Sequence, residues 1–203
     1  NTHSPGSVFK IIMAVAGLTE GVVNEQTSFH CGGGASFYGR FFRCWRKGGH
    51  GSVNARRALM HSCDVYFYNV GQRLGIDRIA RYSRLFGLGS PTGIELEGEK
   101  KGLVPDEEWS LKNRGFKWYP GETISVSIGQ GPVLMTPLQM ATMTGMVANG
   151  GYRVAPHLVQ GARAAAREAR TRARRAALSF VRRLRRLRLA APDLPGAAGR
   201  QAV

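Results

Sequence analysis

The chain has no long apolar run. The longest, Ile11 to Leu18, has eight residues, whereas a helix that crosses a bilayer needs roughly 18–20. The chain also lacks the initial Met and basic first segment that are typical of a secretory signal, and it opens with Asn1-Thr2-His3. These absences exclude a membrane-spanning helix and a signal peptide from the 203 residues, and we expect the chain to be a fragment of a longer protein.

Cysteine is scarce. Cys31, Cys44 and Cys63 are too few and too scattered for a disulfide scaffold. Cys31 and Cys44 are either one bridge in an oxidising compartment or two independent thiols. A zinc site needs four ligands at short spacing, and these two cysteines, with His30 and His50, form no Cys-x-x-Cys pairs. The sequence therefore predicts no metal site and no cofactor.

Acidic residues are few: 13 Asp and Glu stand against 29 Lys and Arg, for a net charge of +16. Most of this charge lies in residues 161–203, which hold twelve Arg, no Lys and two acidic residues, Glu168 and Asp193. This change of composition predicts a domain over residues 1–160 and an Arg/Ala-rich tail over 161–203. The tail is either an out-of-frame reading of G+C-rich DNA or a genuine basic extension, disordered or helical.

A basic tail is also typical of modules that bind nucleic acid or anionic lipid, and the repeated Arg and Leu of residues 182–188 fit a basic amphipathic helix. No stacking aromatics accompany these arginines, so we expect no nucleic-acid partner. Within residues 1–160, the hydrophobic patterning predicts an α+β fold. Its expected helices lie near residues 7–18, 53–60, 65–74, 76–86 and 136–147, with a strand at 122–127.

The sharpest local motif is a Ser-x-x-Lys at the start of an apolar helix, Ser7 to Lys10, directly after Pro5-Gly6. Residues i and i+3 share one helix face, so the Lys10 amine can reach the Ser7 hydroxyl. Apolar neighbours favour a neutral lysine that accepts a proton, and this combination makes a nucleophile with its base. The alternative is a serine that caps the helix beside an exposed lysine.

Ser62-Cys63-Asp64 follows 55 residues later, and taken alone it could be a helix cap. With the first motif, it resembles the second motif of the active-site serine penicillin-recognising enzymes. The resemblance is to the transpeptidase domain of class B penicillin-binding proteins, in particular the group that serves cell elongation in Gram-negative bacteria. It extends in order from residue 4 to about 160 through further matching segments: Phe42-Arg43-Cys44-Trp45, Gly49-His50-Gly51, Gly87-Leu88-Gly89, Ser127-Ile128-Gly129-Gln130-Gly131 and Thr136-Pro137-Leu138-Gln139.

The resemblance implies a role for each matched residue. Ser7 would attack the D-Ala–D-Ala amide of a peptidoglycan stem peptide, Lys10 would take its proton, and Ser62 would relay protons to the leaving group. Asp64, where the family often has Asn, would hold Lys10 and the substrate backbone. The Ser7 backbone N–H would supply half of an oxyanion hole.

The segment Ser127 to Gly131 either lines the cleft, with Ser127, Gly129 and Gln130 binding substrate, or is a plain turn between a strand and a helix. The family's third motif, Lys-Thr-Gly or Lys-Ser-Gly, occurs nowhere in the chain. We therefore expect a partial transpeptidase domain of the serine β-lactamase-like kind, with helices on an incomplete antiparallel sheet and little cross-linking activity.

The resemblance also implies a location and partners: the periplasmic face of the inner membrane, stem peptides, β-lactams and the membrane proteins of the elongation machinery. A β-lactamase or a D,D-carboxypeptidase on the same scaffold is the enzymatic alternative. A cationic fragment that binds nucleic acid or lipid without catalysis is the other.

Overall fold

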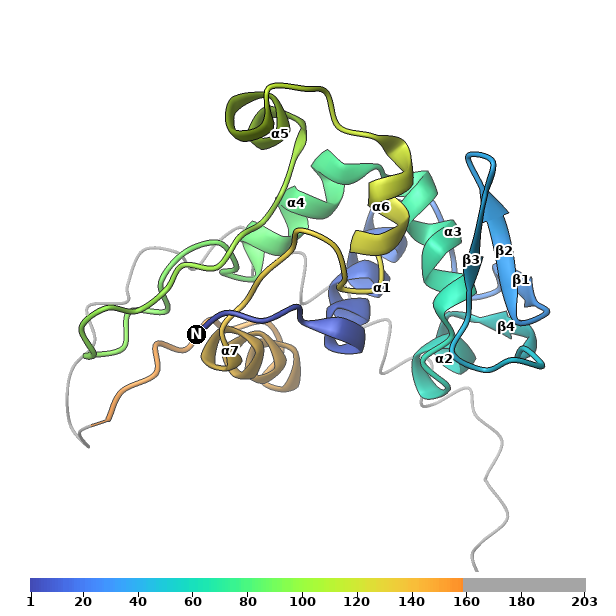
Figure 1. Ribbon diagram of the computed structural model, residues 1–203. Helices are drawn as coiled ribbons and strands as arrows, with labels where there is room; N and C mark the ends of the chain where they lie inside the picture. Colours follow the sequence, from blue (N-terminus) through green and yellow to red (C-terminus); the bar gives the residue numbers. More distant parts are fainter. Residues whose placement is uncertain (159–203) are drawn as a thin grey trace, which may run out of the picture.

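The computed structural model describes residues 1–158, and the Arg/Ala-rich tail lies outside these residues. The described part mixes helices with short antiparallel strands, as expected for an α+β fold (Figure 1). Its elements follow one another in this order: η1 (Gly6–Phe9), α1 (Lys10–Thr19), β1 (Ser28–Cys31), β2 (Gly34–Phe37), β3 (Arg40–Arg43), β4 (Gly51–Asn54), α2 (Ala55–Met60), α3 (Asp64–Leu74), α4 (Ile76–Leu85), α5 (Glu107–Arg114), α6 (Pro120–Val126) and α7 (Pro137–Ala148).

Helix α1 forms the centre of the core. Its residues from Ile12 to Leu18 are buried, as the continuous apolar sequence predicts. Helix α3 packs across it, and the two approach closely at Gly17, where a Cβ would meet Val70 at 2.9 Å. The first and second motifs begin these two helices, so core packing brings the motifs together.

The strands form two separate antiparallel ribbons. β1 pairs with β4, and β2 pairs with β3 (Figure 1). The β2–β3 hairpin lies between Cys31 and Cys44 in the sequence, and Cys44 N–H donates to the Gly33 carbonyl at 2.9 Å. The two ends of the hairpin therefore lie next to each other, beside the start of α3.

Most of the predicted helices are confirmed, and the helix-start signals explain why. Thr136 caps α7 in a full capping box with Gln139, and Pro137 occupies the first helical position. The helix expected over 53–60 begins only at Ala55, because Val53 belongs to β4 and Asn54 caps α2.

The strand expected at residues 122–127 is wrong, since this segment is helix α6. Pro120 starts the helix, and Thr123, Ile124 and Val126 are all buried, which a one-sided strand would not permit. No helix within residues 1–158 is long and apolar enough to cross a membrane.

Candidate functional site

Ser7 and Lys10 lie at the start of the central helix, in opposite environments. Ser7 is exposed in the short 3-10 turn η1, whereas Lys10, one turn on, is only 2 % exposed. Lys10 Nζ donates to Ser7 Oγ at 3.1 Å. The Ser7 hydroxyl is therefore accessible from solvent, and the Lys10 amine is not.

The second motif completes a triangle with these two side chains. Ser62 Oγ donates to Ser7 Oγ at 2.8 Å and accepts from Lys10 Nζ at 2.9 Å. Ser62 has φ +51°, a left-handed conformation that costs a non-glycine residue about 1–3 kcal/mol and that surrounding contacts must hold in place. This strained turn directs the Ser62 hydroxyl at Ser7.

Asp64 neutralises the buried lysine. Its Oδ1 lies 2.5 Å from Lys10 Nζ, and the two side chains are 11 % and 2 % exposed. The Asp64 Oδ2 atom accepts from the backbone N–H of Trp45 at 2.9 Å. Both carboxylate oxygens are thus bonded, which offsets the cost of burying the charge. The predicted contact between Asp64 and Lys10 is present.

The three predicted substrate-binding residues have different environments. Ser127 is fully buried, and its hydroxyl donates to the Ile124 carbonyl at 2.6 Å. The prediction that Ser127 binds substrate is therefore wrong. Gly129 accepts from Gly6 N–H at 2.9 Å, and a Cβ there would lie 2.2 Å from the Gly6 oxygen. Gly129 therefore supports the turn before the nucleophile, and of the three only Gln130, which is exposed, faces solvent.

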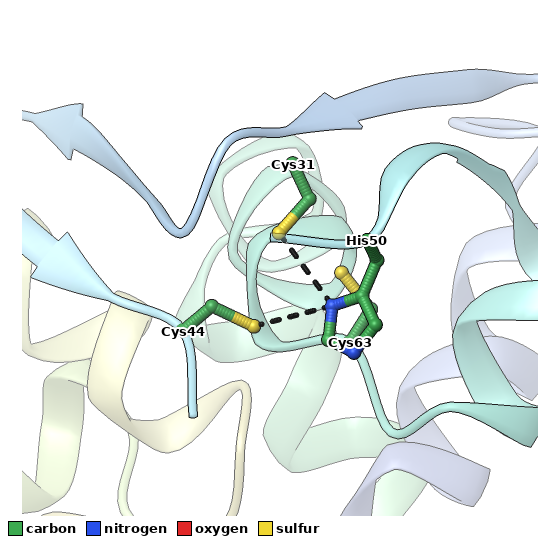
Figure 2. Close-up of side chains that lie close together, drawn as sticks. All are labelled: Cys31, Cys44, His50 and Cys63. Atoms are coloured by element: carbon green, nitrogen blue, oxygen red, sulfur yellow. Dashed lines mark hydrogen bonds between the residues drawn. The ribbon is translucent and has the colours of Figure 1, made fainter. Parts of the chain in front are cut away.

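A second cluster lies directly behind the site. Cys31, Cys44, His50 and Cys63 direct three sulfurs and one ring nitrogen toward one point, and all four atoms lie within 4.8 Å of one another (Figure 2). His50 Nδ1 is 3.6 Å from both the Cys31 and the Cys44 sulfur. All three cysteines are free and buried, so the Cys31–Cys44 disulfide considered above is not formed.

The dimensions of this cluster fit a tetrahedral metal ion. Zinc lies about 2.3 Å from thiolate sulfur and about 2.0–2.1 Å from imidazole nitrogen, which places those two ligand atoms about 3.6 Å apart. The two measured sulfur–nitrogen distances have this value. Three thiolates and an imidazole are also ligands that favour zinc over magnesium or calcium.

The protonation chemistry of the cluster supports the same assignment. Burial is the main cause that lowers the pKa of His50, which favours the neutral imidazole that binds metals. Burial alone would raise the pKa of Cys31, but hydrogen bonds from the Gly33 and His50 backbone and from Cys63 and Cys44 lower it. Burial raises the pKa of Cys63 to about 12, and a bound metal ion would remove this penalty because it binds the thiolate directly.

The sequence-based prediction of no metal site rests on His30 and the short spacing of the ligands, whereas the structure brings Cys63, and not His30, into the cluster. The four donors come from the end of β1, the residue after β3, the segment before β4 and the start of α3, so no short motif contains them. A signal was nevertheless present, since Gly33 and Gly49 flank these ligands at positions that tolerate no side chain. A Cβ at Gly49 would lie 2.0 Å from the Cys31 carbonyl oxygen.

Comparison with known proteins identifies the family of the chain. Residues 1–180 match the family described as penicillin binding protein transpeptidase domain. The chain is 43 % identical over 164 residues to the peptidoglycan D,D-transpeptidase MrdA of Acinetobacter baumannii, covering 78 % of this chain and 24 % of that protein. The chain therefore spans about a quarter of the length of this curated relative.

Solved structures show the same similarity. The penicillin-binding protein PBP2 of Helicobacter pylori, in complex with MreC, superposes with a TM-score of 0.82 at 32 % identity, covering 91 % of this chain and 34 % of that one. PBP2 of Pseudomonas aeruginosa in complex with WCK 5153 gives a TM-score of 0.76 at 39 % identity, with 78 % and 37 % covered.

Proposed function

This chain belongs to the penicillin-binding protein transpeptidase family, and we propose that it carries the acylation centre of a peptidoglycan D,D-transpeptidase, with Ser7 as its nucleophile. The observation that carries the proposal is the closed triangle of Ser7 Oγ, Ser62 Oγ and Lys10 Nζ, with sides of 2.8, 2.9 and 3.1 Å. A nucleophile within hydrogen-bond reach of two proton carriers is the arrangement that covalent catalysis requires.

In the proposed reaction, Ser7 Oγ attacks the carbonyl carbon between the two terminal D-Ala residues of a stem peptide. A C–O bond forms, the C–N bond breaks, and the released D-Ala takes up the proton that Ser7 gave up. Ser62 bridges Ser7 and Lys10, so it can deliver that proton without displacement of any heavy atom. The amine of a second stem peptide then attacks the acyl-enzyme and restores Ser7.

Asp64 supports this cycle by its charge. Lys10 Nζ lies within hydrogen-bond distance of four oxygens, those of Ser7 and Asp64 and both the carbonyl and hydroxyl of Ser62, so an ammonium would have acceptors for all three of its N–H groups. An ammonium cannot accept a proton, so one of its own must first move away. Asp64 Oδ1 is the nearest acceptor. Because Asp64 carries a carboxylate, it can take up this proton, whereas the amide of an Asn at the same position could not.

The Lys-Thr/Ser-Gly motif is absent from the 203 residues. We propose that the backbone N–H of Ser7 supplies one oxyanion donor. Removal of one such donor costs about 10²–10³ in rate in other acyl-transfer enzymes. We further propose an extracytoplasmic location. We also propose elongation-machinery partners, which the PBP2–MreC complex of H. pylori supports.

The test is acylation of the full chain by a fluorescent penicillin, with the modified peptide identified by mass spectrometry. We expect a covalent adduct on Ser7, no adduct in Ser7→Ala, and a normal adduct in the matched control Ser4→Ala, which removes a nearby exposed hydroxyl. Prompt release of the bound penicillin would indicate a β-lactamase or carboxypeptidase instead. An adduct that survives Ser7→Ala would refute the proposal.

A further inference from the structure

The β2–β3 hairpin and the start of α6 enclose a slot. Phe37, Tyr38, Arg40 and Phe42 line one side of it, and the segment from Tyr119 to Glu122 lines most of the other. The slot has a volume of about 320 Å³, which is at the lower end of the range of ligand pockets in proteins. Helix α3 contacts both walls and lies between them (Figure 1).

The slot lies away from the nucleophile. It is at the Pro120 end of α6, whereas the Val126 end leads into the turn where the Gly129 carbonyl accepts from Gly6 N–H. A seven-residue helix is about 10 Å long, so a ligand in the slot leaves the Ser7 hydroxyl free.

Aromatic rings form the floor and the rims of the slot. The rings of Phe37 and Phe42 pack on Tyr68 of α3, with centroid distances of 6.0 and 5.7 Å. Tyr38 and Tyr119 belong to the two opposite walls, and their side chains are 55 % and 62 % exposed. Flat apolar faces therefore stand open to a ligand on both sides of the slot.

Tyr38 occupies a position that favours a much smaller residue. Tyr38 and Gly39 form the two-residue turn of the hairpin, with φ of +51° and +75°. Such turns favour Asn-Gly, Asp-Gly or Gly-Gly, and a bulky residue at positive φ is an outlier. Burial does not explain it, since Tyr38 is more than half exposed. Backbone strain of this kind is concentrated at functional sites, and contact of the ring with a ligand would account for it here.

The charge around the slot suits a carboxylate. The Arg40 guanidinium lies 5.6 Å from the Phe42 ring centroid, and no carboxylate within residues 1–158 forms an ion pair with it. Glu122 lines the slot, but Arg114 neutralises it at 2.9 Å. Residues 26–63, which include all four strands and α2, contain six Lys or Arg and no Asp or Glu. The surface at the slot therefore attracts anions.

We propose that this slot binds the acidic end of a peptidoglycan stem peptide, with a carboxylate on Arg40 and the neighbouring aliphatic carbons between Tyr38 and Tyr119. The identity of the ligand rests on the proposed function, whose substrate is a strand that carries many stem peptides. A strand held by one stem peptide in the slot presents its other stem peptides to Ser7 at a raised effective concentration. The slot is thus a docking subsite and takes no part in bond formation.

The first experiment measures binding of a disaccharide tetrapeptide, cut from peptidoglycan by a muramidase and labelled with a fluorophore on its reducing sugar. This probe lacks the D-Ala–D-Ala bond, so it cannot acylate Ser7. Fluorescence anisotropy with the full chain should show that Arg40→Gln weakens binding at least tenfold, the effect of losing a charged hydrogen-bond donor.

The matched control is Arg43→Gln. It removes the same charge from the same strand, but Arg43 lies on the opposite face of β3 because side chains alternate along a strand. We expect it to change binding less than twofold. Equal weakening by the two variants would overturn the proposal, since binding would then follow net charge alone.

The ligand provides a second control. The same muropeptide with its carboxylates converted to amides keeps its size and its sugars, and we expect it to bind at least tenfold more weakly. Penta-L-glutamate represents an acidic segment of a partner protein, and we expect it to bind more weakly than the muropeptide. Equal binding of the amidated form, or tighter binding of penta-L-glutamate, would overturn the assignment to a stem peptide.

Tyr38→Asn separates a binding role from a structural one. Asn-Gly is a favoured sequence for this turn, so the variant should melt at a higher temperature than the wild-type chain. It should nevertheless bind the muropeptide about two- to tenfold more weakly, because one aromatic wall is lost. Unchanged binding in this variant would refute the role of the strained ring and with it the proposed slot.

Penicillin labelling distinguishes this inference from the proposed function. If the muropeptide binds in a manner that depends on Arg40 but penicillin never reacts with Ser7, the proposed function fails and the binding slot stands. If penicillin reacts with Ser7 but Arg40→Gln binds the muropeptide as tightly as the wild-type chain does, this inference fails and the proposed function stands.

Discussion

The buried ion pair between Lys10 and Asp64 permits a quantitative test by a double-mutant cycle. The pair has a separation of 2.5 Å and side-chain exposures of 2 % and 11 %. Lys10→Met leaves the Asp64 carboxylate unpaired, and Asp64→Asn leaves the ammonium unpaired while keeping an oxygen acceptor. Removing one partner of a buried pair costs about 3–5 kcal/mol. In a chain of this size, that cost lowers the melting temperature by about 6–20 °C.

The double mutant distinguishes a paired charge from two independent contributions. With both charges gone, no buried ion is left unpaired, so we expect the double mutant to lose less stability than either single mutant, under about 3 kcal/mol. Additive behaviour would instead give about 6–10 kcal/mol. Urea unfolding followed by tryptophan fluorescence measures all four proteins, with penicillin labelling in parallel. Additivity within about 0.5 kcal/mol would refute the ion-pair reasoning.

Two further predictions concern the turn before the nucleophile and the acid limit of stability. Gly129→Ala should slow acylation at least tenfold, because its Cβ would lie 2.2 Å from the Gly6 backbone oxygen. The control, Gly131→Ala, has a similar φ but no contact under 3.6 Å. It should cost only about 1 kcal/mol of stability and leave the acylation rate unchanged. Burial alone would raise the pKa of Asp106, but the Trp109 N–H and the Arg84 guanidinium hold it below its usual value. Its stabilisation is therefore present above about pH 4 and lost as the pH falls further. Asp106→Ala should cost about 0.5–2 kcal/mol at pH 7 and less at pH 3, measured by thermal unfolding; an equal cost at both pH values would contradict this account.

The contact between Ser7 and Lys10 could be predicted because local rules place the two side chains. Ser7 and Lys10 are three residues apart at the start of an apolar helix, which is sufficient to bring their side chains together. Cap and turn residues likewise located α7. The distance between the two motifs could not be predicted from periodicity, since it depends on how α1 and α3 pack, and here the family resemblance supplied the connection.

The metal cluster and α6 were missed for different physical reasons. The four metal-ligand candidates come from four segments, and only the tertiary fold brings them together. In α6, seven residues with alternating apolar positions fit a strand as well as a helix that is buried on most sides. Pro120 at the helix start was the better indicator.

The Lys10–Asp64 pair also affects which rotation and register α1 adopts in the core during folding. Because α1 is apolar around nearly its whole circumference, hydrophobic burial is almost the same at several rotations or one-residue shifts of the helix. The observed arrangement places the Lys10 ammonium beside the Asp64 carboxylate, whereas a one-residue shift of the helix turns each side chain by about 100° and separates the two charges. The ion pair therefore selects the register of the central helix, so the same contact that prepares the nucleophile's partner also excludes misaligned folds.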